Sequence, residues 1–557
     1  GVDGKTIEHL AKMTEKEVIE LVRNKLEWYT PKAIRRVEID KGNGKKRPLG
    51  IASIEDRLIQ QCILQILEPI CEAKFFKRSN GFRPNRSAEH AISQSYKFIQ
   101  GQNLHFVVDI DIKGFFDNVS HGKLLKQMWT LGIRDKKLLS ILSAMLKAEI
   151  AEIGFPDKGT PQGGIISPLL SNIVLNELDW WVASQWENLP TRTPYKCREL
   201  KNGTLDKSNV YAELRKTGLK ECYIVRYADD FKIFCRYRSD AQKIFAAVKQ
   251  WLHDRLSLEI SPEKSKIVNL KRQYSEFLGF KMKAVKKGKK SNGQSKYVVQ
   301  SHISDKAKDK IKQKAVKAVN ELKQIDAKGN TILRYNALVI GWHNYYQFAT
   351  HVSRDFSEIA FLVKSSSKGK LEQQMKKKTA KPIASPVYIK YSKSKEIRFI
   401  GDTPILPIAY VRHKNPIDKK RSINSYTAQG RAEIHKKLSC INMGILHYLM
   451  RNPVRDMSVE YNDNRLSLYC SQQGKCAVTG MPLEIGRIHC HHRTAKHLGG
   501  NDSYTNLILV DIDVHTLIHA TKEETIQKLL ALLQLDKKQL TKINRLRNLL
   551  NLNEILQ

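Results

Sequence analysis

The segment CYIVRYADDFKIFC, residues 222–235, sets two adjacent carboxylates, Asp229 and Asp230, between two apolar stretches with the residue pattern of β-strands. Adjacent carboxylates at a turn between strands are costly to bury unless a cation neutralises them. Hard divalent cations take oxygen ligands, so this turn predicts a metal site. An Asp-Asp pair alone also occurs in ordinary hairpin turns, so further residues must complete the site.

A second acidic strand supplies them. The segment LHFVVDIDI, residues 104–112, is rich in β-forming residues and carries Asp109 and Asp111. Because side chains alternate along a strand, these two carboxylates share one face. An Asp from each strand can hold two Mg²⁺ ions, as in-line nucleotidyl transfer requires. In that chemistry one ion activates a 3′-hydroxyl and the other binds the leaving pyrophosphate.

Composition narrows the class of protein. The chain has 557 residues, which predicts three or four domains, and its 41% hydrophobic content fits folded protein. Its formal net charge of +40 favours a nucleic-acid partner over an anionic membrane. A merely solvated basic protein would need no carboxylate constellation. No apolar run is long enough to span a bilayer, no secretory signal is present, and the scattered cysteines are typical of reduced thiols. We therefore expect a cytoplasmic protein, bacterial or in an organelle; Gly1 leaves open what precedes it.

Six short motifs follow one another along the first half of the chain. In order they are KRPLGI (46–51), GFRPNRSAEHA (81–91), DIKGFFDNVSH (111–121), GTPQGGIISPLLSNIVLNELD (159–179), RYADD (226–230) and FLGF (277–280). Together they resemble the fingers and palm of reverse transcriptases encoded by group II introns. The resemblance implies an α+β right-hand polymerase fold and an RNA-directed DNA polymerase that uses dNTPs.

The resemblance also implies which carboxylates do the chemistry. Asp111, Asp229 and Asp230 match the catalytic triad that binds two Mg²⁺ ions. The family places the first catalytic Asp at the start of DIKGFFD, which leaves Asp109 outside the triad. We expect Asp109 to pair with a nearby Lys or Arg.

Three further residues are implied to face the nucleotide or template. Phe115 stands where the family carries an aromatic gate against the ribose 2′-hydroxyl, although a core residue next to Phe116 is an equal interpretation. Gln162 and Gly163 lie in a Pro-Gln-Gly-Gly turn, where missing Cβ atoms let backbone approach a ligand.

Lys41 and Arg47 flank a Gly-Asn-Gly turn and resemble finger residues that clamp the incoming triphosphate. Arg suits bidentate phosphate contact. For Lys41 a simple surface charge is the alternative.

The segment AVNELKQIDAKGNTILRYNALVIGWHNYYQF, residues 318–348, resembles the thumb, or X domain, of intron maturases. Binding of the intron RNA and help with its splicing are implied by that resemblance. Trp342, Tyr345 and Tyr346 could stack on bases, but their helical spacing is more typical of a core face.

Histidines mark a second chemical site within residues 487–520. His515 and His519 are four apart, which on a helix places both on one face. His491 and His492 are adjacent on a predicted strand, so they point opposite ways. One can bind a metal while the other faces a substrate.

A strand-like segment between these pairs, TNLILV, carries Asn506, and the whole resembles the ββα-metal, or HNH, nuclease motif. The implied roles are general base for His492, metal ligation for His491, His515 and His519, and hydrogen bonding between the two halves for Asn506. One divalent cation, Mg²⁺ or similar, would polarise the scissile phosphate and stabilise the leaving 3′-oxygen. Three His ligands leave a coordination position open. A structural zinc site is the alternative.

Many intron nucleases carry two Cys-x₂-Cys pairs for a structural zinc, and this sequence departs from that pattern. Cys476 is present, but Thr479 stands where the second Cys would be, and no second pair follows His519. Cys470, Cys476 and Cys490 have irregular spacing. We therefore predict no structural zinc, which puts more of the stability on the core.

The sequence as a whole predicts a multifunctional intron-encoded enzyme. It would bind its intron RNA, promote splicing, cut one strand of target DNA and extend the 3′ end, which is retrohoming. The predicted segments are fingers and palm (1–280), thumb or X domain (281–383), a basic DNA-binding segment (384–461) and the HNH domain (462–557).

Two rival functions are a retron, diversity-generating or defence-associated reverse transcriptase, and a maturase that binds RNA without polymerising. The first group generally lacks the HNH tail, and loss of the acidic triad would mark the second. A group II ribozyme in the DNA flanking the gene would discriminate among them.

Overall fold

The structure is a computed structural model. It describes residues 1–40, 46–199, 205–289, 291, 293–323, 329–367, 373, 375–377, 389–401, 403–418, 423–435 and 441–555. Two compact units divide the chain, residues 1–421 and 422–557. Helices and sheets are mixed in both, which confirms the expected α+β class at this level. The division into four segments stays a prediction.

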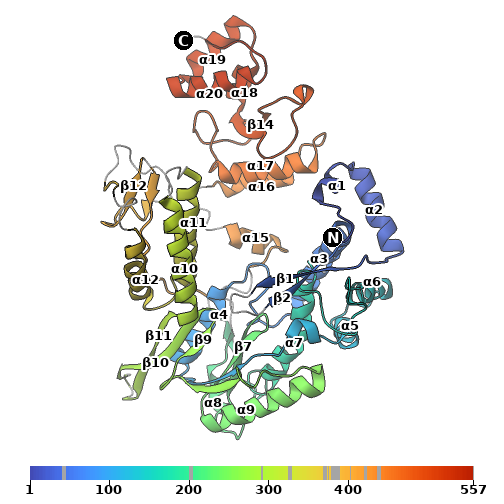
Figure 1. The fold of residues 1–557 in the computed structure, drawn as a ribbon, viewed down its shortest axis with the longest axis vertical. Helices are drawn as coiled ribbons and strands as arrows, with labels where there is room; N and C mark the ends of the chain where they lie inside the picture. Colours follow the sequence, from blue (N-terminus) through green and yellow to red (C-terminus); the bar gives the residue numbers. More distant parts are fainter. Residues whose placement is uncertain are drawn as a thin grey trace. The chain divides into compact units, whose positions relative to one another are not determined.

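The first unit begins with two helices, a β-hairpin and a long helix (Figure 1). Their bounds are α1 (Ile7–Ala11), α2 (Glu15–Glu27), β1 (Arg35–Asp40), β2 (Lys46–Ile51) and α3 (Ile54–Lys74). Side-chain caps start two of the helices: Thr14 and Glu17 form a capping box on α2, and Ser53 accepts from the Asp56 amide at α3.

A four-stranded antiparallel sheet lies at the centre of this unit. Its order is β6 (Cys222–Tyr227), β7 (Asp230–Cys235), β3 (Phe106–Ile110) and β8 (Lys266–Asn269). Nearly every residue of β6 and β7 is buried, as expected for strands covered on both faces. The strands predicted in 104–112 and 222–235 are confirmed.

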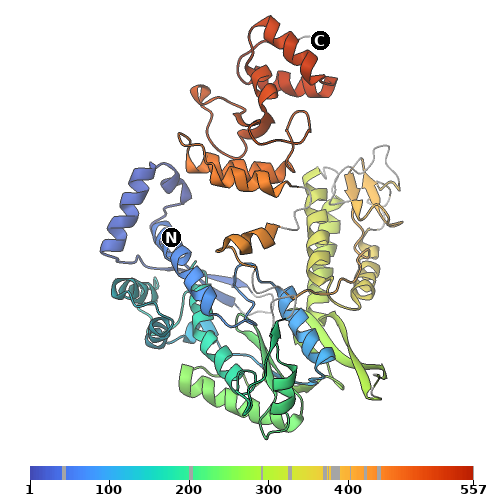
Figure 2. The ribbon, with the colours of Figure 1, turned by 180° about the vertical axis from the view of Figure 1, so that it is seen from behind.

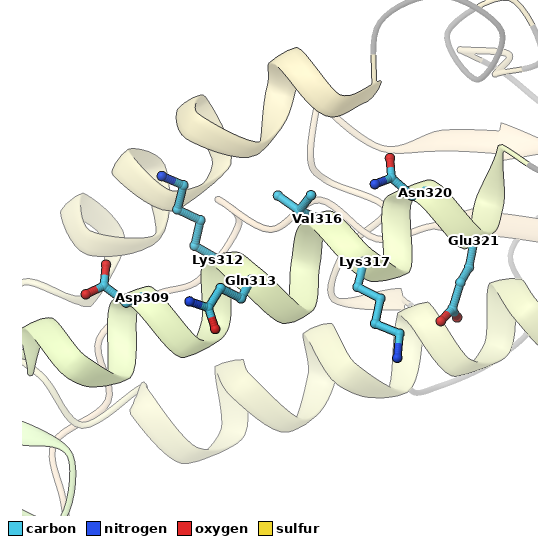
Figure 3. Close-up of a pocket in the computed structure, with 7 residues that line it drawn as sticks. All are labelled: Asp309, Lys312, Gln313, Val316, Lys317, Asn320 and Glu321. Carbon is cyan, nitrogen blue, oxygen red and sulfur yellow. The ribbon is translucent and has the colours of Figure 1, made fainter. Parts of the chain in front are cut away.

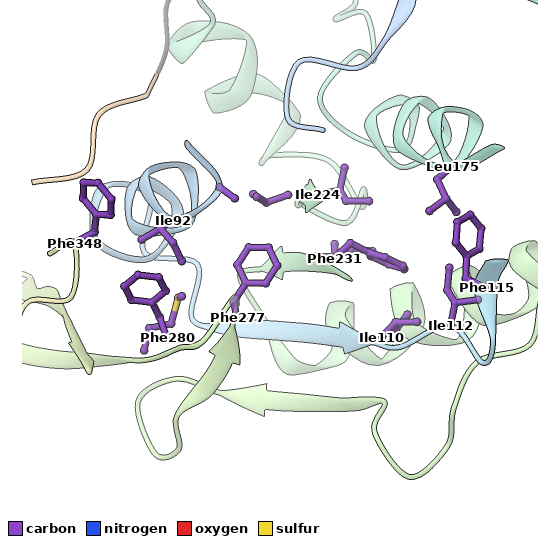
Figure 4. Packing of buried hydrophobic residues seen from close by; sticks show 14 of the residues in the cluster. Ile92, Ile110, Ile112, Phe115, Leu175, Ile224, Phe231, Phe277, Phe280 and Phe348 are labelled. Atoms are coloured by element: carbon purple, nitrogen blue, oxygen red, sulfur yellow. The ribbon is translucent and has the colours of Figure 1, made fainter. Parts of the chain in front are cut away.

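Helices pack against this sheet and complete its core (Figures 1 and 4). They are α4 (Ala88–Tyr96), α7 (Ser167–Ser184) and α9 (Arg238–Trp251), of which α9 packs on β3, β7 and β8 while α4 and α7 pack on β6. Further elements are η1 (Lys97–Gly101), η2 (Phe115–Asn118), α5 (His121–Thr130), α6 (Lys136–Leu146), β4 (Arg198–Glu199), β5 (Leu205–Asp206), α8 (Ser208–Leu214) and η3 (Leu252–Leu256). Phe231 and Phe277 are fully buried in the resulting core.

The first unit continues into a β-sheet and a helical bundle (Figures 1 and 2). The sheet has the order β11 (Ser295–Ile303), β10 (Phe280–Lys289) and β9 (Ser275–Phe277). Helices α11 (Gly329–Tyr346) and α12 (Val352–Ser367) pack on α10 (Asp305–Leu322), and a small hairpin follows, β12 (Arg398–Ile400) with β13 (Thr403–Ile405). A shallow surface groove of about 650 Å³ runs along α10, lined by Lys312 and Lys317 among others (Figure 3).

The second unit has its own hydrophobic core. Its elements are α15 (Ala428–His435), α16 (Met443–Arg451), α17 (Val459–Ser471), β14 (Ile488–His492), η4 (Lys496–Leu498), β15 (Leu507–Asp511), α18 (Ile512–His519), α19 (Glu523–Leu533) and α20 (Lys537–Asn548). Strands β14 and β15 pair antiparallel, and α18 packs against both. The core beneath them includes Leu509, Val514 and Ile543.

Among the described residues, none of the helices combines the length and apolar character needed to cross a membrane.

A glycine lies directly beneath the turn that joins β6 and β7. A Cβ atom on Gly81 would stand 2.2 Å from the Ala228 nitrogen and 2.8 Å from the Tyr227 carbonyl carbon. Both contacts are with backbone, which cannot rotate away as a side chain can. The absence of a side chain at Gly81 therefore fixes how closely this turn can pack.

We expect Gly81→Ala to destabilise the first unit by about 1–3 kcal/mol, because the added methyl must displace the turn. Gly122→Ala is the matched control: Gly122 lies in α5 and has nothing within 4 Å of its Cβ position. Alanine is the better helix former, so that change should stabilise by roughly 0.4–1 kcal/mol. Urea unfolding of both variants measures the difference. Equal midpoints for the two would contradict the packing argument.

Candidate functional site

Three carboxylates meet at one end of the four-stranded sheet. In the ladder between β3 and β7, Ile110 faces Phe231, so Asp111, the next residue after β3, lies level with Asp230, the first residue of β7. Tyr227 pairs with Asp230, which leaves Asp229 in the two-residue turn between β6 and β7. The register of the sheet thus brings together the three carboxylates that the sequence indicated.

The environment of Asp230 favours a bound cation. Although part of its side chain is exposed, the surrounding protein desolvates the carboxylate and raises its pKa to about 6. Lys232 opposes that effect, and the like charges of Asp109, Asp229 and Asp111 add to it. A divalent cation would relieve this repulsion, and the all-oxygen donor set fits hard ions such as Mg²⁺.

Asp111 has a positive neighbour. Its Oδ2 lies 3.0 Å from Nζ of Lys264, and both side chains are largely solvent-accessible. Exposed ion pairs contribute only about 0–1 kcal/mol, so a metal ion can replace this ammonium at small cost. The Asp111 amide donates to Ser265 Oγ at 3.2 Å, which fixes the backbone where the strand ends.

Asp109 is held in a buried ion pair. Its Oδ1 lies 2.7 Å from Nζ of Lys232, and Ser275 Oγ donates to its Oδ2 at 3.0 Å. The pairing expected for Asp109 is therefore present, and this carboxylate supports the strand from within.

A buried arginine supports the turn between β6 and β7 that carries Asp229. Ala228 has a φ of 58°, a left-handed conformation that costs a non-glycine residue roughly 1–2 kcal/mol. Arg226 is fully buried, and its Nη1 donates to the Ala228 carbonyl at 2.8 Å and to Asn172 Oδ1 at 2.9 Å. Its Nη2 and Nε donate to Asp179 at 2.6 and 2.9 Å. Asn172 in turn donates to the Gly81 carbonyl at 2.9 Å, so one network holds the strained turn from behind.

The Pro-Gln-Gly-Gly turn docks on strand β2. The Gly50 amide donates to the Gln162 carbonyl at 2.7 Å. Gly163 has a φ of 112°, and a Cβ there would approach the Gly50 oxygen to 2.8 Å. Arg47 belongs to β2, but its side chain lies outside the described residues, as does Lys41 altogether.

The two phenylalanines of DIKGFFD, Phe115 and Phe116, differ in solvent exposure. Phe115 is 3% exposed and belongs to the core of the first unit, where Figure 4 draws it, so its burial fits the core interpretation. Phe116 is half-buried, and its ring lies 6.5 Å from that of Phe82, which is largely exposed. The Phe116 carbonyl accepts from the Thr160 amide at 2.7 Å, so Phe116 borders the Gln162 turn. Of the pair, Phe116 has the more exposed ring.

Two tyrosines of α11, Tyr345 and Tyr346, pack against the turn at residues 278–279. Trp342 and Tyr346 are partly buried against the core. Tyr345 is 42% exposed, and its hydroxyl donates to the Leu278 carbonyl at 3.0 Å. The core interpretation therefore suits Trp342 and Tyr346, whereas Tyr345 both packs and presents a surface.

In the second unit, three histidines converge from β14 and α18. The ligand atoms of His491, His515 and His519 all lie within 4.8 Å of one another. Burial, followed by the other histidines, lowers the pKa of His491 to about 3, and burial likewise lowers the pKa of His515 to about 4. Neutral imidazoles are the form that binds metals, so this donor set fits a divalent ion.

His492 points to the opposite side of β14, as the strand alternation predicted. Its Nε2 lies 2.7 Å from Asp502 Oδ1, and its ring stacks on Tyr461 with centroids 5.5 Å apart. Neither Asp502 nor Tyr461 belongs to a motif that the sequence shows. Asp502 lies in the 493–506 loop and Tyr461 on α17, and nothing in the local pattern marks either as a neighbour of His492.

Asn506 closes the loop between β14 and β15. Its side chain donates to the carbonyls of Thr494 and Asn501 at 3.0 and 2.8 Å and accepts from the Thr494 amide at 2.9 Å. Its own carbonyl accepts from the Arg493 amide at 2.7 Å. These contacts are of the kind predicted, because they tie the strand to the segment that follows it.

The three C-terminal cysteines do not gather into a cluster with the other described residues. Cys476 and Cys490 are buried in the core of the second unit, and Cys470 is half-buried beside it. Within the described residues, His491, His515 and His519 form the only set of three or more His, Cys, Asp or Glu side chains whose ligand atoms all lie within 4.8 Å of one another. The expectation of no structural zinc stays a prediction.

Similarity to known proteins covers the part of the chain that carries Asp111, Asp229 and Asp230. The profile of the family described as "Reverse transcriptase (RNA-dependent DNA polymerase)" matches residues 39–282, which include all three clustered carboxylates. The chain is 36% identical over 293 residues to "Group II intron-encoded protein LtrA" of Lactococcus lactis subsp. cremoris, covering 47% of this chain and 48% of that protein.

A second relative is "Protein YkfC" of Escherichia coli, which is 33% identical over 268 residues; the match covers 46% of this chain and 68% of that protein. A third is "Uncharacterized 91 kDa protein in cob intron" of Schizosaccharomyces pombe, which is 26% identical over 411 residues; the match covers 65% of this chain and 48% of that protein. The chain thus spans about half the length of LtrA. The matched domain and these relatives together show that the chain belongs to the reverse transcriptase family of the group II intron-encoded proteins.

Proposed function

We propose that this protein copies RNA into DNA at the cluster of Asp111, Asp229 and Asp230, helps its intron RNA to splice, and nicks target DNA with its second unit. The observation that carries the polymerase role is the register of β3 and β7, which sets Asp111 level with Asp230 beside Asp229. The profile match across these residues supports it.

Asp111, Asp229 and Asp230 would hold two Mg²⁺ ions. When bound, such ions lower the pKa of the primer 3′-hydroxyl and neutralise the triphosphate charge. The 3′-oxygen then forms a bond to the α-phosphorus of a dNTP, the bond to the β-phosphate oxygen breaks, and pyrophosphate leaves while the hydroxyl proton passes to solvent. The Arg226 network supports this by holding the turn in place before substrate arrives.

The nucleotide would lie between the carboxylates and the Gln162 turn. The absence of a side chain at Gly163 lets this turn dock tightly on Gly50, which fixes the position of the turn against β2. Phe116, rather than the buried Phe115, has an accessible ring at this turn. We infer that the Phe116 ring occupies the space that a ribose 2′-hydroxyl would need.

RNA binding is supported by charge and by exposed groups of the thumb-like bundle. The net charge of +40 favours a polyanionic partner. The groove along α10 places Lys312 and Lys317 beside the amides of Gln313 and Asn320, which can contact a sugar-phosphate backbone (Figure 3). Assistance to splicing rests on the kinship with intron-encoded proteins.

The second unit would act as an HNH nuclease. His491, His515 and His519 would hold one divalent cation, which supplies charge stabilisation at the scissile phosphate. His492 lies on the other side of the strand, where it can take a proton from water. Cleavage that leaves a 3′-hydroxyl would give the polymerase its primer, so the two activities form one reaction sequence.

Asp230→Asn should abolish primer extension, because the change removes a negative charge that the metal ions require. Intron RNA binding should stay within a few-fold of the parent protein. Asp254→Asn, an exposed carboxylate elsewhere in the first unit, is the control and should extend primers normally. Extension assays with and without intron RNA measure this; a parallel loss of RNA binding would refute the separation of chemistry from recognition.

Phe116→Ala should raise ribonucleotide incorporation relative to deoxynucleotides, measured as the ratio of kcat/KM values, because the ring no longer excludes the 2′-hydroxyl. Phe115→Ala should instead destabilise the protein by about 3–5 kcal/mol and leave that ratio unchanged, since it creates a core cavity. The reverse pattern would assign the gate to Phe115.

His492→Ala should reduce nicking of the target strand by about 10²–10⁴-fold and spare extension of a supplied primer. Metal binding should persist, because the three ligating histidines remain. Nicking at the parent rate by this variant would show that another group activates the water.

A further inference from the structure

The imidazole of His492 is fixed at one nitrogen by a carboxylate that is itself held in place. Asp502 Oδ1 lies 2.7 Å from His492 Nε2. Its other oxygen, Oδ2, accepts from Ser458 Oγ at 2.7 Å and from Lys496 Nζ at 3.0 Å. The Asp502 side chain is 11% exposed, so these contacts are shielded from water.

This contact determines the tautomer of His492. A carboxylate at neutral pH only accepts hydrogen bonds, so Nε2 must carry the hydrogen. In the neutral ring the lone pair then belongs to Nδ1. The side chain therefore presents a basic nitrogen at the edge of the ring that faces away from Asp502.

The ring orientation is fixed as well. Tyr461 stacks on His492 at an interplanar angle of 20°, and its hydroxyl donates to the Cys490 carbonyl on the same strand at 3.1 Å. Asn464, from the same helix, donates to the Asp502 carbonyl at 2.8 Å. Helix α17 thus holds both the ring and the loop that carries the carboxylate.

We propose that Asp502 is a positioning residue for the nuclease reaction: it sets the tautomer and orientation with which His492 Nδ1 takes a proton from the attacking water. The proposal rests on the proposed nuclease function and adds a residue that neither motif nor spacing marks. Water oxygen bonds to phosphorus, the bond from phosphorus to the 3′-oxygen breaks, one water proton passes to Nδ1, and the departing oxygen takes a proton from solvent.

The substitution Asp502→Asn is a sharp test, because Ser458 and Lys496 determine the orientation of the new side-chain amide. Ser458 and Lys496 both donate, so the single amide oxygen must face them. The NH₂ group then points at His492 Nε2 and forces the hydrogen onto Nδ1, which reverses the tautomer. We expect kcat for nicking to fall by about 10²–10⁴-fold, the usual contribution of general base catalysis. KM and metal affinity should remain near those of the parent protein.

Two comparisons exclude a merely structural effect. Asp463→Asn makes the same charge change on an exposed position of α17 and should nick normally. In a His492→Ala background, Asp502→Asn should cost almost nothing further, because its effect passes through the missing ring. Full nicking by Asp502→Asn, or an undiminished loss in the His492→Ala background, would overturn the proposal.

A spectroscopic readout separates this proposal from the nuclease function. In full-length protein labelled with ¹⁵N-histidine, the His492 signals, assigned by their loss in His492→Ala, should report hydrogen on Nε2 in the parent and on Nδ1 in Asp502→Asn. If the parent protein nicks no DNA, the proposed nuclease function fails while these shifts still test Asp502. An unchanged tautomer would refute the positioning role whatever the activity.

Discussion

The antiparallel ladder between β3 and β7 determines where the reactive groups of the first unit lie. Because side chains alternate with a period of two, a slip of one residue would turn Asp109 to the opposite face, away from Lys232, and move Asp111 away from Asp230. The register is fixed by burial: Val108, Ile110, Phe231 and Ile233 are all inside the core. The same hydrophobic pattern that makes these strands pair therefore also assembles the carboxylates, and the buried pair of Asp109 and Lys232 reinforces that one register.

A buried arginine adds a constraint that hydrophobic packing cannot supply. Arg226 and Asp179 are both fully buried, and removing one partner of such a pair typically costs about 3–5 kcal/mol. Replacing both with apolar residues often costs nothing, so stability alone does not explain the pair. The geometry of the pair explains it better. The Arg226 guanidinium donates hydrogen bonds to the Ala228 carbonyl and to Asn172, and so holds the left-handed residue Ala228 beside two carboxylates that repel each other.

Sequence reasoning succeeded where the functional groups are set by local periodicity. The strands around Asp111 and Asp230, and the helical spacing of His515 and His519, follow from alternation and from the 3.6-residue turn. It left Phe115 open between an aromatic gate and a core residue, because Gly114 adopts a φ of 55° and the chain enters a 3₁₀ turn, in which strand alternation no longer applies. Arg47 and Lys41 cannot be judged within the described residues.

The roles of the residues that support the two sites could not be predicted from the sequence for a different reason. Gly81 meets Ala228 across 147 positions of sequence, Asp179 meets Arg226 across 47, and Tyr461 meets His492 across 31. Only the tertiary fold creates these contacts, so neither motif nor period signals them in a single sequence. Gly81, Asp179 and Arg226 each lie within one of the sequence motifs, but the reason for each residue is visible only in its tertiary contacts.

The two sites share a physical design despite unrelated folds. In each, the candidate catalytic groups are backed by a residue with several hydrogen bonds: Arg226 behind Asp229 and Asp230, and Asp502 behind His492. Their donor sets differ, with carboxylate oxygens in the first unit and neutral imidazoles in the second, and oxygen sets suit Mg²⁺ whereas imidazoles suit transition ions. The two units therefore offer a divalent ion different ligand chemistry, oxygen atoms in the first and imidazole nitrogens in the second.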